Sequence, residues 1–196
     1  MPKGKLIIIS SPSGGGKDAV INALLKIFPN SARLVTTTSR PPRPGNKEGV
    51  DYFFISKNKF EEKIKQDAFL EHNIYSENYY GVEKMRLNEA LEKHSLVFTQ
   101  IEVNGKHNLD KQSIEHLAVY LLPENIDVLR ARIERRGGLN KAQIDERIEV
   151  AKREIEASTD YDYRVVNVQG KLAETVEKIV EIIKHNVALD KKHVLY

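Results

Sequence analysis

Short apolar runs rich in Leu, Ile and Val recur along the chain, and each is followed by a longer stretch that mixes polar and apolar residues. The clearest runs cover residues 6–10, 96–99, 118–122 and 163–168. Continuous apolar runs of this length are typical of strands in a parallel sheet that is covered on both faces. We therefore expect each of these segments to be a buried strand.

Apolar residues recur at helical spacing in the stretches between the runs. The helices expected from this spacing cover residues 19–28, 60–64, 83–91, 130–136, 144–155 and 172–187. Pro29-Asn30 is expected to end the first helix, and the polar tail 189–196 is expected to fray. The alternation of strand and helix predicts an α/β fold with a doubly wound parallel sheet.

The stretch from Arg33 to Glu92 interrupts this alternation. Residues 34–38 and 51–55 look like short strands, whereas the prolines between residues 39 and 45 exclude a helix or a central strand there. We expect an insertion that carries a second substrate. The predicted division has residues 1–32 and 93–196 as a core, with a lid at about 136–150, and residues 33–92 as the inserted subdomain.

The loop after the first strand has the composition of a phosphate-binding P-loop. Its residues 11–18 read Ser-Pro-Ser-Gly-Gly-Gly-Lys-Asp, against the usual pattern G-x-x-x-x-G-K-[ST]. Backbone N–H groups of Ser13 to Gly16 (Ser13, Gly14, Gly15 and Gly16), Lys17 and the dipole of the following helix together favour an anion. The alternative is a glycine-rich turn without function, but strand, loop and helix follow one another in the order that a P-loop needs.

Asp18 stands where a neutral hydroxyl usually binds Mg²⁺. At about 4 Å and an effective dielectric constant near 20, its charge and a phosphate charge repel by roughly 4 kcal/mol. With Mg²⁺ between them the effect reverses, because carboxylate oxygens are good ligands for this ion. The alternative is that Asp18 only stabilises the helix N-terminus, by about 0.3–1 kcal/mol.

Other charged residues lie where a phosphate substrate could use them. Arg40 and Arg43 lie on the proline-rich loop, and planar guanidinium groups suit bidentate phosphate contacts, although loop arginines are often only solvated. Glu102 follows a buried strand, where ligands of α/β sheets commonly bind. Arginines 130–136 precede Gly137-Gly138, and they form either a solvated face or part of a lid.

Composition limits the choice of function further. The 196 residues contain no cysteine, so the chain has neither a disulfide nor a Cys-based metal site. The net charge of +3 fits an anionic small molecule and does not by itself suggest nucleic acid. No apolar run is long enough to span a membrane or to serve as a signal peptide, so we expect a cytoplasmic protein. Monomer and homodimer both remain open.

Several segments, in order, resemble the guanylate kinase family, and the resemblance covers nearly the whole chain. The segments that carry it are residues 36–45, 49–54, 69–72, 78–81 and 161–167. The resemblance implies transfer of the γ-phosphoryl group of ATP to GMP with Mg²⁺, in a protein with a core, a GMP-binding domain and a lid.

The resemblance also implies roles for individual residues. Those implied for the GMP site are Arg40, Arg43, Tyr52 and Tyr80 at the phosphate, Thr36 and Glu71 at the guanine, and Gly81 and Glu102 beside them. A carboxylate suits guanine because it can accept from both N1–H and the 2-amino group. Arg136 and Arg147 match lid arginines that neutralise the transferred group, and Lys17 with Gly14 to Gly16 matches the ATP phosphate site. Magnesium would bind at Asp18, and at Glu102 through water.

Some positions depart from the family. Asn46 replaces a glutamate, Val82 a serine or threonine, Gln100 an acid, and Gly138-Leu139 a Thr-Asp pair. Asp18, Val82, Gln100 and the Val-Asn-Gly at 103–105 are similar to ribose 1,5-bisphosphate phosphokinase. A sugar phosphate, however, offers no base to Glu71. A guanylate-kinase-like binding module without catalysis is the other alternative, although such modules typically have a damaged P-loop.

Overall fold

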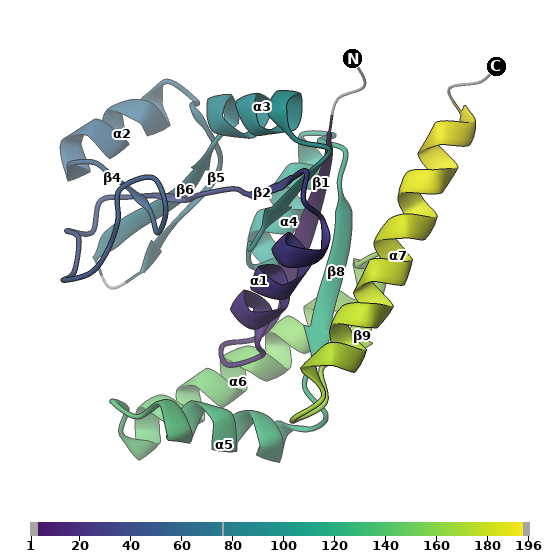
Figure 1. Cartoon of the computed structure of the whole chain (residues 1–196). Helices are drawn as coiled ribbons and strands as arrows, with labels where there is room; N and C mark the ends of the chain where they lie inside the picture. Colours follow the sequence, from purple (N-terminus) through teal and green to yellow (C-terminus); the bar gives the residue numbers. More distant parts are fainter. Residues whose placement is uncertain (1–3, 76, 194–196) are drawn as a thin grey trace. The chain divides into compact units, whose positions relative to one another are not determined.

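The computed structural model describes residues 4–75 and 77–193. The chain forms two compact units (Figure 1). The first unit comprises Met1–Leu6, Asn30–Thr99 and Asn104–His116, and the second comprises Ile7–Pro29, Gln100–Val103 and Leu117–Tyr196. The chain thus passes between the units several times, so each unit is assembled from segments distant in sequence.

The second unit is built on parallel strands. Strand β1 (Lys5–Ser10) pairs with β8 (Leu117–Leu122), which pairs with β9 (Tyr163–Val166), and both pairs are parallel. The apolar side chains of β1 and β8 are almost entirely buried, as their continuous apolar runs predict. The expectation of an α/β fold with a parallel sheet is therefore confirmed.

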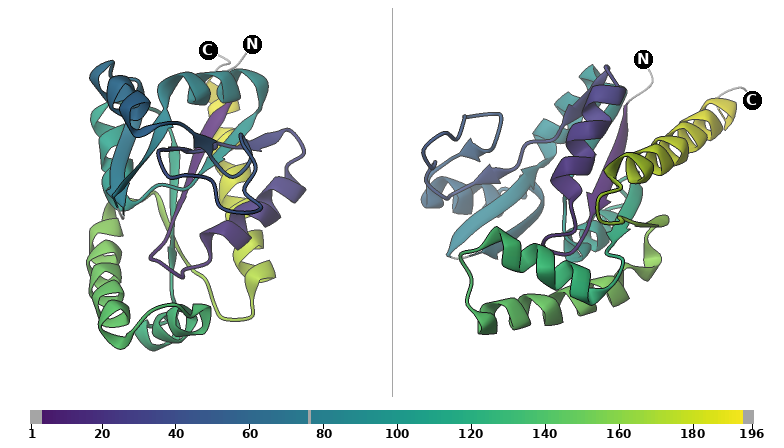
Figure 2. Two further views of the ribbon diagram at one scale, coloured as in Figure 1. Left: turned by 90° about the vertical axis from the view of Figure 1, so that its left-hand side faces the viewer. Right: turned by 60° about the horizontal axis from the view of Figure 1, so that its bottom comes forward.

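Helices of the second unit pack in two groups. Helix α1 (Lys17–Ile27) contacts α7 (Leu172–His193), whereas α5 (Ile126–Arg136) and α6 (Lys141–Ala157) lie side by side (Figures 1 and 2). A 3₁₀ turn, η1 (Ser158–Asp160), follows α6. The α5–α6 pair shares a small apolar core of Leu129, Ile133, Ile144, Ile148 and Ala151. Asn140 begins α6 with a capping box, in which its side chain accepts from the backbone of Gln143.

The first unit contains one parallel strand pair and a separate sheet. Strand β2 (Ser31–Arg33) pairs in parallel with β7 (Leu96–Thr99). The separate sheet has the order β4 (Phe53–Phe54), β3 (Thr37–Thr38), β6 (Asn78–Glu83) and β5 (Phe69–Tyr75). The helices of this unit are α2 (Lys57–Lys65), α3 (Lys84–Lys93) and most of α4 (Val103–Lys111). Phe60 of α2 is fully buried and stacks on Phe69 of β5, with ring centroids 4.2 Å apart.

Several sequence expectations for the first unit were wrong or incomplete. Of the strand expected at 34–38 only Thr37–Thr38 is formed, a separate strand lies before it at Ser31–Arg33, and the strand expected at 51–55 has only two residues. The β5–β6 hairpin was not predicted, because its strands do not keep a regular alternation of apolar and polar residues. Helix α4 was not predicted either, because it contains Asn104 and Gly105, which have low helix propensity. The expected division into domains at residues 33 and 92 remains a prediction.

The C-terminal expectation was also wrong in part. Helix α7 continues to His193, beyond the predicted end at residue 187, and residues 194–196 lie outside the described part of the chain. Within the described residues, no helix is both long and apolar enough to cross a membrane.

Candidate active site

The loop at residues 11–18 joins β1 to α1 and wraps its backbone in front of the helix. Gly14 and Gly16 have φ angles of 85° and 94°, a region that residues with a side chain rarely adopt. Gly16 is the N-cap of α1 and carries no side chain to occupy the space before the first turn. A Cβ atom on Gly16 would also lie 2.6 Å from the Asn167 side-chain nitrogen. No side chain of residue 16 therefore stands in front of the first-turn N–H groups of α1, an arrangement that suits an anion; the predicted phosphate site stays a prediction.

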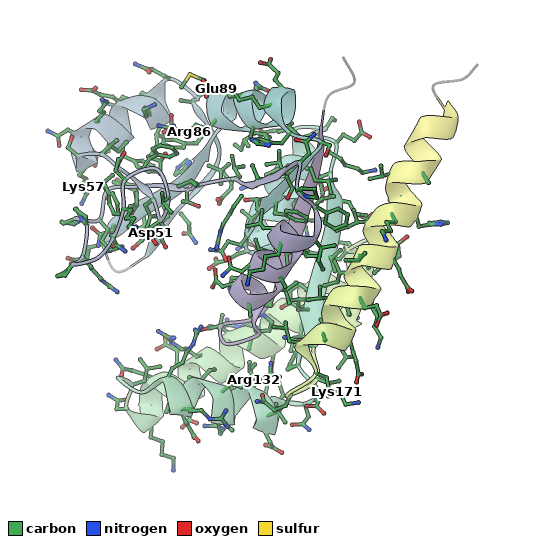
Figure 3. The ribbon with its side chains drawn as sticks, in the orientation of Figure 1. Asp51, Lys57, Arg86, Glu89, Arg132 and Lys171 are labelled. Atoms are coloured by element: carbon green, nitrogen blue, oxygen red, sulfur yellow. The ribbon has the colours of Figure 1, made fainter. Side chains whose placement is uncertain are left out.

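Asn167 fixes this loop to the end of β9. Its Nδ2 donates to the Gly15 carbonyl at 2.8 Å, and its Oδ1 accepts from the Thr175 hydroxyl at 3.1 Å. Its own carbonyl accepts from Nη2 of Arg132 at 3.0 Å (Arg132 is labelled in Figure 3). Asn167 is 6% exposed, so these bonds hold the loop from a buried position. Sequence reasoning quoted this residue but gave it no role.

Of the two predicted lid arginines, one reaches the loop. Arg147 on α6 donates from Nη1 to the Ser13 hydroxyl at 3.4 Å, so a cation from α6 contacts the loop at residues 11–18. Arg136 is the last residue of α5 and is exposed. The structure therefore places Arg147, but not Arg136, in direct contact with a residue of the loop.

Glu154 is a half-buried acid on α6 that sequence reasoning missed. Burial and the negative charge of Glu102, partly opposed by the positive charge of Lys17, together raise its pKa to about 7. Glu154 therefore lies close enough to Lys17 and to Glu102 for their charges to influence it. Its spacing could have indicated this position. Glu154 follows Arg147 by seven residues and Ile144 by ten, and both spacings place residues on the same side of a helix.

Mg²⁺ would depend mainly on the nucleotide and water for its ligands. Among the described residues there is no group of three His, Cys, Asp or Glu side chains that could hold a metal. Mg²⁺ on a nucleotide needs only one or two carboxylates besides the phosphates and water. Asp18 in the first turn of α1 and Glu102 just before α4 are exposed carboxylates that fit this requirement.

In the first unit, Arg40, Tyr52 and Tyr80 come together. The guanidinium carbon of Arg40 lies 5.4 Å from the centre of the Tyr52 ring, and the Tyr52 and Tyr80 ring centres are 5.9 Å apart. Asn46 Oδ1 accepts from Nη2 of Arg40 and from the backbone of Arg43, each at 3.0 Å. The residue that departs from the family at 46 thus holds the arginine loop in shape, and Arg43 itself is exposed.

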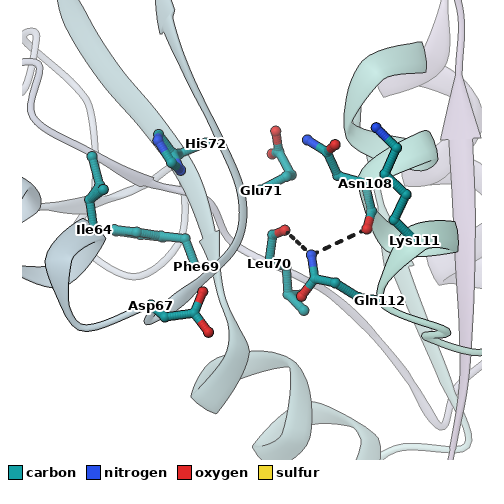
Figure 4. Close-up of a pocket in the computed structure, with 9 residues that line it drawn as sticks. All are labelled: Ile64, Asp67, Phe69, Leu70, Glu71, His72, Asn108, Lys111 and Gln112. Carbon is teal, nitrogen blue, oxygen red and sulfur yellow. Dashed lines mark hydrogen bonds between the residues drawn. The ribbon is translucent and has the colours of Figure 1, made fainter.

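The remaining predicted acceptor residues lie on β3, β5 and β6 or beside them. Thr36 precedes β3 and its carbonyl accepts from the Phe53 backbone at 2.9 Å. Gly81 pairs with Thr37, and Val82 is 2% exposed, so the departure at 82 places a methyl group in the core. Glu71 on β5 lines a cavity of about 300 Å³, into which Asn108 and Lys111 also point (Figure 4).

Glu83 is a buried acid that had no role in the sequence interpretation. It is 2% exposed, and it accepts from Thr37 Oγ1 at 2.6 Å, Lys63 Nζ at 2.5 Å and Arg86 Nε at 3.3 Å. Burial alone would raise its pKa, but the hydrogen bonds from Lys63 and Thr37 and the positive charges of Lys63 and Arg86 hold the pKa below its usual value. The carboxylate therefore ties β3, α2 and α3 together next to Thr36.

Gln100, which stands where the family usually has an acid, has a buried side-chain oxygen. Its Oε1 has no hydrogen-bond partner among the described residues. A carboxylate there would add a buried charge two residues before Glu102, and the amide avoids that charge. The departure therefore lowers the negative charge of this segment.

Comparison with known proteins agrees with this arrangement. A family model described as guanylate kinase matches residues 3–186. A guanylate kinase of Latilactobacillus sakei is 39% identical to this chain, and the match covers 91% of this chain and 89% of the relative. A guanylate kinase of Clostridioides difficile is 37% identical, and the match covers 98% of this chain and 95% of the relative. The crystal structure of guanylate kinase from Anaplasma phagocytophilum has a TM-score of 0.72 at 26% identity, covering 95% of this chain and 87% of that one. The chain belongs to the guanylate kinase family.

Proposed function

We propose that this chain transfers the γ-phosphoryl group of ATP to GMP, giving ADP and GDP. The observation that carries the proposal is the donor loop: Lys17 and the glycine backbone form an anion-binding turn, and Arg147 contacts it at Ser13. The residues that match the family's acceptor site support it, since Arg40, Tyr52 and Tyr80 cluster in the first unit.

The proposed chemistry needs no protein nucleophile. The attacking atom is a phosphate oxygen of GMP, which is already anionic, so no strong general base is required. Catalysis then consists of holding the two phosphates in line and neutralising their charge. Lys17 and the amides of Gly14 to Gly16 would hold the donor phosphates, and Arg147 with Arg136 would neutralise the transferred group. Arg40, Arg43, Tyr52 and Tyr80 would hold the acceptor phosphate.

We assign acceptor choice to Glu71 and Thr36, and we include Gly81 and Glu102 in the proposed GMP-binding set. The Glu71 carboxylate can accept from the N1–H and the 2-amino group of guanine together, and adenine lacks this pair of donors. The same carboxylate argues against a ribose bisphosphate acceptor, which has no base. The intact glycines and Lys17 argue against a binding module without catalysis.

Magnesium is part of the proposal. Asp18 would bind it directly or through water, and Glu102 through water. When bound, Mg²⁺ neutralises phosphate charge during transfer. The net charge of +3 fits anionic small-molecule substrates. We propose a cytoplasmic enzyme that binds neither nucleic acid nor membrane. Its oligomeric state is proposed to be a monomer or a homodimer.

An acceptor panel tests the proposed function. The purified protein with Mg²⁺ and ATP is given GMP, dGMP, AMP, UMP and ribose 1,5-bisphosphate in parallel, and ADP formation is measured. We expect the highest kcat/KM with GMP. Preference for ribose 1,5-bisphosphate would support the sugar-phosphate alternative, and ATP binding without turnover of any acceptor would support the binding module.

A further inference from the structure

Strand β5 carries one residue too many at Leu70. Phe69 pairs with Glu83 and Glu71 with Val82, so two steps along β5 oppose a single step along β6. Leu70 is therefore a β-bulge, and Phe69 and Leu70 are both 5% exposed although neighbouring residues of a regular strand face opposite sides. Gly81 leaves room for this irregularity, since a Cβ atom there would lie 2.8 Å from the Phe69 ring and 3.0 Å from the Glu71 carbonyl.

Gln112 at the end of α4 holds this bulge. Its Nε2 donates to the Leu70 carbonyl at 2.8 Å and to the Asn108 carbonyl at 3.2 Å, which uses both hydrogens of the amide (Figure 4). Asn108, Lys111 and Gln112 are spaced i, i+3 and i+4, so α4 presents them on one face. All three line the cavity that also contains Glu71.

The bond acts on the peptide group that leads into Glu71. The Leu70 carbonyl and the Glu71 N–H belong to one planar peptide unit, so fixing the direction of the carbonyl also fixes the start of residue 71. Bulges commonly re-aim a side chain next to a functional site. The direction of the Glu71 carboxylate therefore depends on the Leu70 peptide, and Gln112 restrains that peptide from another element.

We infer that Gln112 is a positioning residue for base recognition, which it serves by holding the Leu70 bulge so that Glu71 meets both donors of guanine. The inference rests on the proposed role of Glu71. Accepting from two parallel N–H groups is more sensitive to the direction of the carboxylate than accepting from one. IMP has the N1–H but not the 2-amino group, so misdirection of Glu71 costs GMP more than IMP.

The ratio of kcat/KM for GMP to that for IMP measures this effect. Gln112→Met keeps the length of the side chain and removes the donor. We expect the ratio to fall by about 2- to 10-fold, the equivalent of one hydrogen bond, mainly through a higher KM for GMP. The KM for ATP should not change. Gln66→Met is the matched control, because Gln66 is exposed at the end of α2.

A double-mutant cycle separates positioning from a loss of stability. If Gln112 acts through Glu71, Gln112→Met adds no further change in the ratio to a Glu71→Gln protein. An unchanged ratio in Gln112→Met, or an equal loss for GMP and IMP, overturns the inference and leaves the proposed function intact. A Glu71→Gln protein with the wild-type ratio also overturns it, whereas a wild-type protein that does not phosphorylate GMP overturns the proposed function as well.

Discussion

Replacing Glu83 with glutamine removes one buried charge and keeps the size of the side chain. The wild-type carboxylate accepts hydrogen bonds from Thr37, Lys63 and Arg86, on three different elements of the first unit. A hydrogen bond to a charged group contributes about 1.5–3 kcal/mol when it is buried. The Lys63 and Arg86 side chains are 24% and 28% exposed, so both recover part of their hydration in the variant.

We therefore expect Glu83→Gln to lower the free energy of unfolding by about 2–3 kcal/mol at pH 7. For a chain of this size, that loss corresponds to a fall in Tm of about 4–12 °C. The KM for GMP should also rise, because the bond from Thr37 holds the strand that follows Thr36. Urea unfolding and steady-state kinetics measure the two effects.

The pH dependence provides a second check. Because the pKa of Glu83 is lowered in the folded protein, its charge stabilises the fold above the unfolded pKa and this stabilisation is lost as pH falls through the folded pKa. The difference in unfolding free energy between wild type and Glu83→Gln should therefore become smaller at acidic pH. Glu89→Gln is the control, since Glu89 is exposed on the same helix as Arg86 (Figure 3). A difference from that control below about 0.5 kcal/mol at pH 7 would refute the reasoning.

Three further substitutions test the donor side. Asp18→Ser should make ATP affinity depend less steeply on Mg²⁺, and equal dependence in titrations of both proteins would exclude Asp18 as a ligand. The raised pKa of Glu154 makes its ionisation costly in the folded protein, so wild type should lose stability relative to Glu154→Gln as pH rises from about 4.5 to 7. After allowance for solvent screening, we expect this change to be about 1–2 kcal/mol in the free energy of unfolding. A difference in unfolding free energy between the two proteins that stays constant with pH in urea unfolding would be inconsistent with this. Asn167→Ala should weaken ATP binding about 3- to 10-fold relative to the exposed control Asn22→Ala, and equal affinities would show that the loop does not need this anchor.

Much of the second unit could be predicted from the sequence. Its strands are continuous apolar runs, its helices keep helical spacing, and the glycines of residues 14–16 have few other uses between a strand and a helix. The role of Asn167 could not be predicted, because a hydrogen bond to the Gly15 carbonyl joins residues 152 positions apart. Local patterns carry no information on such contacts.

The first unit was harder to predict for a physical reason. Strands β3 and β4 have only two residues each, and β5 contains the Leu70 bulge, which breaks the alternation that marks a half-buried strand. Glu83 looks like an ordinary surface acid at a helix start, and only the arrangement of Thr37, Lys63 and Arg86 around it shows that it is buried. The resemblance to the family supplied Arg40, Tyr52 and Tyr80, and the structure brings these residues together.

The most direct test of the account is the kcat/KM for GMP of wild type and of Glu71→Gln, measured at saturating ATP and Mg²⁺. The account predicts efficient phosphorylation of GMP by wild type and a loss of about 10- to 1,000-fold in the variant, because both donors of guanine lose their charged acceptor. The KM for ATP should be the same in both proteins. Equal GMP kinetics in the two proteins would contradict the account, since guanine would then be selected without Glu71.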